Sequence, residues 1–166
     1  MKISHETISD EYPNLIRTLR GLNGKTIDVG AFEGEHAWLV GIHEYGCKIK
    51  VTPKMRAWFA YQGYPLKKTT TEITIPERSF IRAGHDQYSE EVLKEAESVI
   101  DDVLVGTMSV ERYCELIGML MSERIKDFAT DLKNPPNSGM TADRKGSSNP
   151  LVDTGHMIQS ITYEVK

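Results

Sequence analysis

The segment SEEVLKEAESVIDDVLVGTMSVERYCELIGMLMSERIKDFATDL, residues 89–132, carries the strongest pattern in the chain. Its apolar side chains recur every three or four residues, which is the period of a helix with one buried face. Ser89 and Ser109 are suitable N-cap residues, and Gly106 separates the two apolar runs. We therefore predict two helices, over about 89–105 and 109–132, that pack together as a hairpin.

On the N-terminal side of this hairpin, the pattern predicts one helix followed by strands. Apolar residues at helical spacing indicate a helix from about Ser9 to Arg20. Alternating or β-branched apolar runs then predict strands. These runs are KTIDVGAF (25–32), AWLVGIHEYG (37–46), KIKVT (48–52) and TTTEITIP (69–76), the last of them ended by Pro76. A short helix or turn is expected between the last two.

The C-terminal part begins with NPPNSGMTADRKGSSNP, residues 134–150, whose Pro, Gly, Ser and Asn content predicts a long loop or extended arm. Asp153 or Thr154 is a candidate cap for a short helix that starts at Gly155, and alternating residues from Ile161 onward indicate a final strand. The expected fold is one α+β domain over residues 1–166. A mostly antiparallel sheet of about four to five strands would pack against the helical hairpin and the N-terminal helix.

The length of 166 residues fits one domain, and 39% hydrophobic with 27% charged residues are enough for a core. No window reaches the roughly 18 apolar residues that a membrane-spanning helix needs, and the first residues lack the apolar core of a signal peptide. We therefore expect a cytosolic protein that makes no membrane contact. Cys47 and Cys114 have no metal-ligand spacing, so both are expected as reduced thiols.

Charge is divided unevenly along the chain. The formal net charge of −4 argues against a nucleic-acid-binding protein. Residues 46–82 nevertheless hold eight bases and two acids, whereas residues 86–131 hold twelve acids and four bases. A molecule with opposed electrostatic ends suits stacking into a ring, although two solvated faces that merely differ explain the charges equally well.

No catalytic constellation emerges from the motifs. Asp153-Thr154-Gly155 is the tripeptide of aspartic proteases, but too few residues follow it to build a cleft, so a helix-start role is favoured. The stretch His43–Cys47 approximates the zinc motif HExxH, with Cys47 where the second histidine belongs and strand-like surroundings. There is no phosphate-binding glycine loop. We expect no enzyme, no metal and no cofactor.

Three blocks of the sequence resemble a family of tailed-bacteriophage neck and tail-completion proteins. The first is His43-Glu44-Tyr45-Gly46, and the second is Ile75–Arg82, in which a strand turns into the long helix. The third, Pro135–Val165, contains a loop, the Pro-Leu-x-Asp-Thr-Gly turn, a short helix and a last strand with Ser-Ile. The resemblance covers most of the chain and fades toward its beginning.

The resemblance implies a structural subunit that assembles as a ring, commonly a hexamer, at the head–tail junction. Its implied partners are copies of itself and the portal, adaptor, head-closure and tail-terminator proteins, without sequence-specific nucleic acid. It would act in the host cytoplasm during assembly and then reside in the virion neck. Candidate assembly residues are Trp58, Phe59, Tyr61, Tyr64, Arg78, Arg82 and Lys145. Candidate structural residues are Pro76, Phe80, Asp153, Thr154 and Gly155.

Other interpretations remain open from the sequence. A tail terminator or other minor tail subunit shares ring assembly and α+β character. A protease of the Asp-Thr-Gly type or a metal-dependent hydrolase would show pepstatin sensitivity or bound zinc. A DNA-binding module would need the basic segment to contact phosphates. The aromatic segment 53–65 is either an assembly surface or a flap over the sheet.

Overall fold

The computed structural model describes residues 12–145 and 149–166, and the fold is of the α+β class. The predicted N-terminal helix is present from Tyr12, while its first residues, 9–11, lie outside the described part. The elements, in chain order, are α1 (Tyr12–Leu22), β1 (Ile27–Gly30), α2 (Gly34–Tyr45), β2 (Cys47–Lys50), α3 (Pro53–Tyr61), β3 (Glu72–Ile75), α4 (Phe80–Leu104), α5 (Val110–Asp131), α6 (Gly139–Lys145), α7 (His156–Gln159) and β4 (Thr162–Val165).

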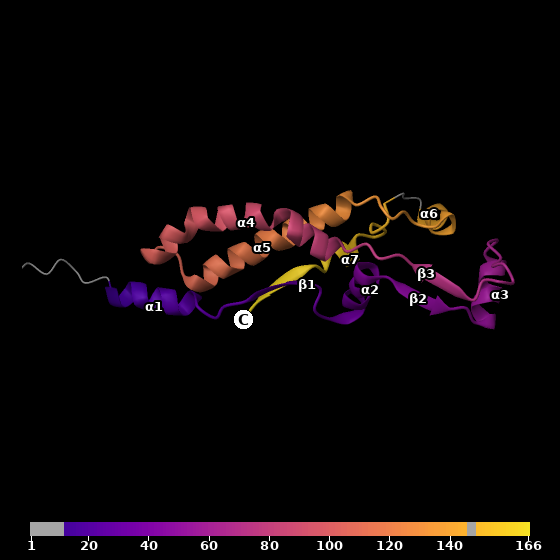
Figure 1. Ribbon diagram of the computed structural model, residues 1–166, viewed down its shortest axis with the longest axis horizontal. Coiled ribbons are helices and arrows are strands. Elements are labelled where there is room, and N and C mark those ends of the chain that lie inside the picture. Colours follow the sequence, from indigo (N-terminus) through magenta and orange to yellow (C-terminus); the bar gives the residue numbers. More distant parts are fainter. Residues whose placement is uncertain (1–11, 146–148) are drawn as a thin grey trace, which may run out of the picture.

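Helices α4 and α5 pack along each other and form the body of the molecule, as the sequence predicts (Figure 1). Ser109 caps α5 by accepting a hydrogen bond from the Arg112 amide at 3.1 Å. The core lies between this hairpin and the elements packed against it, and its largest fully buried side chains include Phe80, Ile125 and Ile161. Phe80, one of the candidate structural residues, is therefore part of the core.

Helix α4 begins well before the position that the sequence suggests. Its first residue is Phe80, not Ser89, and it runs for 25 residues. Ser79, the residue at its N-cap, has a left-handed backbone with φ of 40° and makes no side-chain cap. The helix start is therefore held by groups from elsewhere in the chain, which the next subsection describes.

Strands β1 and β4 form an antiparallel pair with Ile27 opposite Val165 and Gly30 opposite Thr162, and the pair lies against α5. Helix α5 presents Gly118 to the ring of Tyr163 on β4. A Cβ at Gly118 would lie 2.5 Å from Tyr163 Cδ2, so only glycine permits this approach. The predicted final strand is present, and it closes the chain against the hairpin.

Strands β2 and β3 form a separate antiparallel pair, with Cys47 opposite Ile75 and Lys50 opposite Glu72. Helix α3 connects them at the far end of the molecule (Figure 1). We call β2, α3, β3 and the loops between them, residues 47–75, the tip. β3 ends at Ile75, immediately before Pro76, as expected.

Two expectations about the sheet are wrong. The strands do not form one sheet of four to five strands but two sheets of two strands each within the described residues. The run 37–46, expected as a strand, is helix α2, which buries Val40 and Glu44 one turn apart on the same face. Segment 134–150, expected as a loop, contains the short helix α6.

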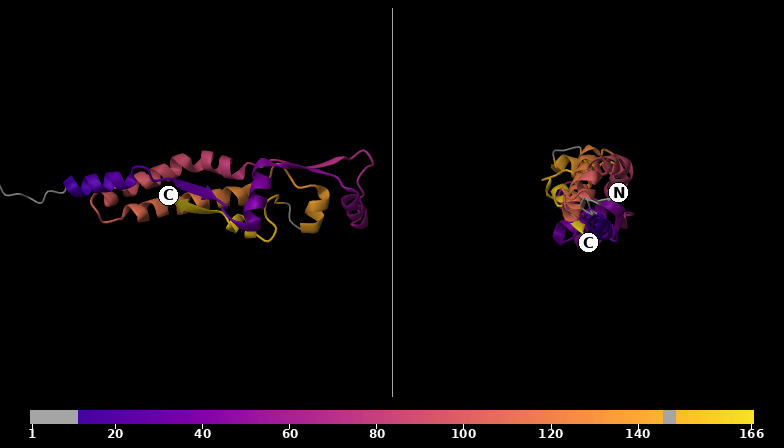
Figure 2. Two further views of the ribbon diagram at one scale, coloured as in Figure 1. Left: turned by 90° about the horizontal axis from the view of Figure 1, so that it is seen from below. Right: turned by 90° about the vertical axis from the view of Figure 1, so that its left-hand side faces the viewer.

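The molecule is elongated, with α1 and the α4–α5 loop at one end and the tip at the other (Figure 2). In the part of the chain that the structure describes, no helix combines the length and apolar content needed to cross a bilayer.

Candidate functional site

The three sequence blocks singled out above meet in space where α2, the start of α4 and the segment after α5 come together. We call this place the junction and define it by His43, Glu44, Arg78, Arg82 and Asn137. Backbone bonds already join the first two blocks, since the Arg78 amide donates to His43 O at 2.9 Å and the Ser79 amide to Glu44 O at 3.2 Å. The junction connects the helical body to the tip.

Glu44 caps helix α4 from a different helix. Its carboxylate is 97% buried and accepts hydrogen bonds from the amides of Ile81, at 2.8 Å, and Arg82, at 3.1 Å. These are two of the amides that a helix start leaves without an intrahelical partner, and a negative charge there also favours the helix dipole. Glu44 therefore performs the role that a local Ser or Asp usually has.

Arg82 completes the charge balance around Glu44. Its Nε lies 2.9 Å from Glu44 Oε1 and its Nη2 lies 2.7 Å from Glu77 Oε1, while the guanidinium stands 4.8 Å from the ring centre of Tyr45. The carboxylates of Glu44 and Glu77 raise the pKa of Arg82. Arg82, a candidate assembly residue, therefore pairs with acids of its own chain.

Arg78 behaves differently, because it meets no acid among the described residues. The residue is 94% buried and donates from Nε to Pro135 O at 3.1 Å and from Nη2 to Asn137 Oδ1 at 3.2 Å. Its Nη1 lies 2.9 Å from His43 Nδ1. Arg78 thus fastens the segment after α5 to α2 through neutral acceptors.

His43 is held neutral beside this guanidinium. Burial, and then the nearby charges of Arg78 and Lys145, lower the pKa of His43 from 6.5 to about 4. A neutral ring can offer Nδ1 as an acceptor to Arg78, whereas a protonated ring would place two cations together. The contact is therefore built for near-neutral pH.

Gly46 lets the first two blocks approach closely. A Cβ at this position would lie 2.7 Å from Glu77 N and 2.8 Å from Ile75 O, and the backbone φ is +67°. Both features exclude other residues without distortion. Each residue of His-Glu-Tyr-Gly therefore has a structural role. His43 contacts Arg78 and Glu44 caps α4. The Tyr45 ring contacts Arg82, and Gly46 admits the backbone of the second block.

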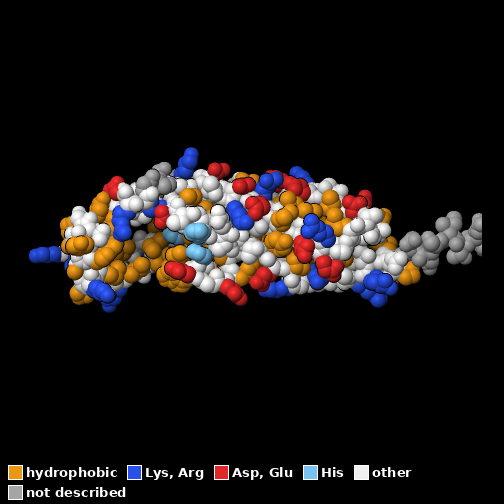
Figure 3. Space-filling model, turned by 180° about the vertical axis from the view of Figure 1, so that it is seen from behind, with side chains coloured by type: hydrophobic (Ala, Val, Ile, Leu, Met, Phe, Trp, Pro, Cys, Tyr) orange, Lys and Arg blue, Asp and Glu red, His pale blue; other side chains and the backbone are white. Residues whose placement is uncertain are grey.

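The tip is basic and rich in exposed aromatic side chains (Figure 3). Tyr61 is 87% exposed, and Trp58 and Tyr64 are also exposed. The tip holds six cations, Lys48, Lys50, Lys54, Arg56, Lys67 and Lys68, against the single acid Glu72. No ion pair within the described residues joins any of the six to an acid.

Arg56 gives the tip its internal order. Its guanidinium donates to the carbonyls of Leu66, Lys67 and Thr70 at 3.2, 2.8 and 2.7 Å. The loop that carries Lys67 and Lys68 is thereby held beside α3. Thr52 caps α3 by accepting from the Met55 amide at 3.2 Å.

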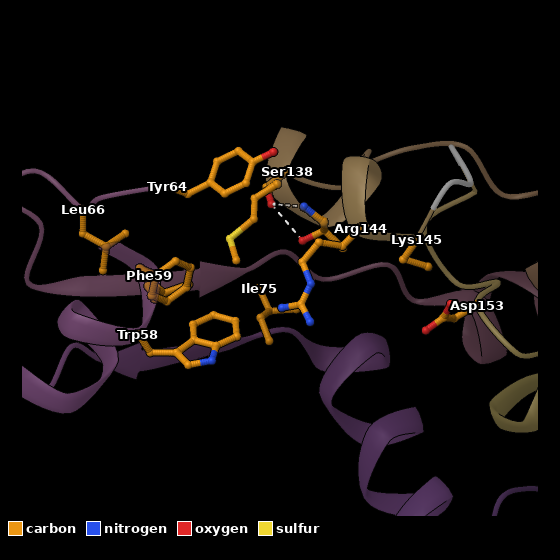
Figure 4. Close-up of a pocket in the computed structure, with 12 residues that line it drawn as sticks. Trp58, Phe59, Tyr64, Leu66, Ile75, Ser138, Arg144, Lys145 and Asp153 are labelled. Carbon is orange, nitrogen blue, oxygen red and sulfur yellow. Dashed lines mark hydrogen bonds between the residues drawn. The ribbon is translucent and has the colours of Figure 1, made fainter. Parts of the chain in front are cut away.

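A groove of about 690 Å³ lies between α3, β3 and α6, and Figure 4 shows its lining. Trp58, Phe59 and Tyr64 come from the tip side, while Arg144 reaches in from α6. The Arg144 guanidinium stands 5.3 Å from the Trp58 ring centre, and Tyr64 Oη donates to Asp143 at 2.5 Å. These contacts hold α6 against the tip.

Apart from Lys145, the predicted assembly residues lie in two separate groups. Trp58, Phe59, Tyr61 and Tyr64 belong to the tip, where the rings of Trp58 and Phe59 meet edge to face at 5.1 Å between centres. Arg78 and Arg82 belong to the junction.

Lys145 is the last residue of α6 and lines the groove between α3, β3 and α6. Its ammonium donates to the carbonyls of Asn149 and Pro150 at 3.3 and 3.4 Å, and burial lowers its pKa. Of the predicted assembly residues, Lys145 therefore connects α6 with the C-terminal segment that follows it.

The predicted capping roles of Asp153 and Thr154 are wrong. Helix α7 begins after Gly155, which has a φ of +83°, and no side chain caps it. Gly155 itself occupies the N-cap position, since only glycine adopts this backbone without strain. Asp153 instead lines the groove, and its charge offsets part of the lowering of the Lys145 pKa that burial causes.

The motifs discounted in the sequence have the following positions. His43 and Glu44 lie on α2, but Cys47 is already the first residue of β2. The rings of His36 and His156 stack at 6.1 Å between centres. Within residues 12–145 and 149–166, no group of three or more His, Cys, Asp or Glu could hold a metal ion. Cys47 and Cys114 are free thiols, as predicted.

Sequence reasoning missed Glu44, His43 and Asn137 as partners of the two arginines. The available signal was the i, i+4 spacing of Val40 and Glu44, which places the apolar and the acidic side chain on the same face of a helix. A buried acid in a region rich in arginine indicates an ion pair.

No protein-family model, curated protein or solved structure matches the chain.

Proposed function

We propose that this chain is a structural virion protein of a tailed phage or prophage, which assembles as a ring at the head–tail junction. In this proposal the subunits form in the host cytoplasm and join copies of themselves and the portal, adaptor or head-closure and tail-terminator proteins. In this proposal the chain catalyses no covalent reaction and acts through the shape and charge of its surfaces.

The observation that carries the proposal is the convergence of the three sequence blocks at the junction. Unrelated short matches have no reason to share one place in a fold. Here Glu44 and Gly46 of the first block hold the helix start and the backbone of the second. Arg78 of the second block holds Pro135 and Asn137 of the third. The resemblance therefore follows one structural unit.

The distribution of charge along the elongated shape also supports a contact between copies. The tip is basic, whereas α4 and α5 carry the excess of acids counted in residues 86–131. Subunits with two different complementary surfaces join head to tail, and such contacts close into rings when the rotation between neighbours permits.

The proposal is tested by removing the coding region from the phage or prophage genome. We expect induced lysates of the deletion to contain separate filled heads and tails by negative-stain electron microscopy, and the native chain supplied from a plasmid to restore joined virions. The matched control supplies the Gly41→Ala variant, whose added Cβ meets nothing within 4 Å. This variant should complement as the native chain does.

Antibody-gold labelling then gives the position of the protein in the virion. Label at the neck supports the proposal. Label at the end of the tail tube, with tails of uncontrolled length in the deletion, would favour a tail terminator instead. Joined, infectious virions from the deletion strain would contradict both.

A further inference from the structure

A second, mainly apolar groove, of about 580 Å³, opens between β1, the first half of helix α4 and the middle of α5, at some distance from the tip. We call it the α4 groove. Ile27 and Val29 of β1 line one side, and Ile81 and Leu93 of α4 line another. Leu93 is 59% exposed, so water contacts a large leucine in the middle of this surface. A leucine in this position has an apolar partner to gain on association.

Asp86 lines the α4 groove, and further acids continue from it along the outer face of α4, where Lys94 is also exposed. Asp86, Glu90, Glu97 and Asp101 follow one another at helical spacing on either side of Leu93, and all four are exposed. We call them the acidic stripe. Arg124 of α5 pairs with Glu91 and Glu95, which are not members of the stripe. Within the described residues, the stripe makes one ion pair, between Asp86 and its neighbour His85 at 3.5 Å.

The tip has the inverse of these properties. Lys54, Ala57, Trp58 and Tyr61 lie on one exposed face of α3, at the same helical spacing. Lys67 and Lys68 lie on the loop that Arg56 holds beside that helix. The tip therefore presents an exposed aromatic residue, Tyr61, with Lys54 on the same helix face and Lys67 and Lys68 on the adjoining loop.

We propose that the tip of one copy docks into the α4 groove of the next copy, with Tyr61 over Leu93 and the tip lysines opposite the acidic stripe. Aromatic anchors surrounded by opposite charges are typical of protein interface cores and rims. The two surfaces lie on different parts of one elongated molecule, so the contact is head to tail and repeats from copy to copy. This inference rests on the proposed function and names the contact that builds the ring.

Charge reversal with exchange tests the contact. One variant, Lys67→Glu/Lys68→Glu, reverses the tip, and the other, Asp86→Lys/Glu90→Lys, reverses the stripe. Each variant alone should associate with itself about tenfold more weakly than the native chain in sedimentation velocity at low salt, since two surface ion pairs are lost and replaced by repulsion. An equimolar mixture should recover native association, because each reversed tip then meets a reversed stripe.

The matched control is Asp127→Lys/Asp131→Lys, which places the same charge change at the same spacing on α5, outside the groove. It should associate as the native chain does. A second measurement uses chains with Cys47→Ser, one carrying Tyr61→Cys and the other Leu93→Cys. Mild oxidation of the mixture should give a disulfide-linked dimer of one chain of each kind.

Two results with the purified protein would overturn the contact, and a third, from complementation, would do so as well. One is a mixture of reversed variants that stays as weak as its components, with no mixed disulfide at the highest soluble concentration. The other is duplex DNA binding that Lys67→Glu/Lys68→Glu abolishes while association is unchanged, which would assign the tip to nucleic acid. If the reversed variants still restore joined virions in the deletion strain, the contact is wrong and the proposed function stands.

Discussion

Replacing Gly118 with alanine probes the contact that fixes the last strand to the helical body. Alanine is a better helix former than glycine, so at an open helical position the change stabilises a protein by up to about 1 kcal/mol. At Gly118, however, the new Cβ would lie 2.5 Å from Tyr163 Cδ2, 2.6 Å from Cγ and 3.0 Å from Cβ. Rotation of the ring cannot relieve a clash that includes the Cβ atom, so β4 has to move.

The expected magnitude combines two opposing effects. Overpacking of this kind costs about 1–3 kcal/mol. The gain in helix propensity offsets about 1 kcal/mol of that cost. We therefore expect Gly118→Ala to lower the free energy of unfolding by up to about 2 kcal/mol. Gly41→Ala in α2, where nothing lies within 4 Å, should raise it by up to about 1 kcal/mol.

Urea unfolding followed by circular dichroism measures both variants, and a double-mutant cycle identifies the cause. In a Tyr163→Ala background the two ring contacts are gone and only the 3.0 Å contact with the Cβ of residue 163 remains, so adding Gly118→Ala should cost clearly less than it does beside Tyr163. The reasoning fails if Gly118→Ala stabilises the chain that retains Tyr163.

Three further changes test the junction and the C-terminal turn by urea unfolding. Glu44→Gln removes the buried charge that accepts from the Ile81 and Arg82 amides, so it should lower the free energy of unfolding by about 1–3 kcal/mol; an unchanged midpoint would show that the cap is dispensable. His43 has a folded pKa of about 4 against 6.5, so between these values the unfolded chain binds the proton, stability falls as pH falls, and the loss is complete below pH 4. Full burial would make this loss of stability about 3 kcal/mol, and partial exposure reduces it to about 1–2 kcal/mol. His43→Gln should therefore lose about 1–2 kcal/mol less stability than the native chain between pH 6.5 and 4. Identical profiles of stability against pH for the two chains would contradict this prediction. Asp153→Ala should change stability by no more than about 0.5 kcal/mol, because Asp153 caps no helix, and a larger loss would restore the capping hypothesis.

The helical hairpin could be predicted because its information is local. Ser109 caps the helix that it precedes, and the apolar spacing of α5 follows one buried face. The start of α4 could not be predicted in this way, because its cap is Glu44, 36 positions before Phe80. Ser89, which looks like a cap, lies in the interior of the helix.

Helix α2 was mistaken for a strand because Trp38, Leu39, Val40 and Ile42 form a short, nearly continuous apolar run. Such a run fits a buried strand and a buried helix equally well. The division into two sheets depends on which strands pair, and β1 pairs with β4 across most of the chain. Period-two alternation indicates that a strand exists but not which partner it takes.

For the candidate site, the residue types were predictable and their grouping was not. The aromatic residues of segment 53–65 and the excess of bases were visible in the sequence, and both belong to the tip. Nothing in the residue pattern indicates that Arg78 holds Pro135 and Asn137 rather than an acid, because carbonyl acceptors leave no trace in composition.

The two ends of the tip leave the body side by side. Lys50 lies opposite Glu72, and the Val51 amide donates to Thr71 O at 2.8 Å. The segment between Lys50 and Glu72 therefore begins and ends at neighbouring positions. Foreign segments are best tolerated at exposed sites of this kind. A different segment placed between these two strands would therefore change the surface at this end of the molecule without rebuilding the helices that support it.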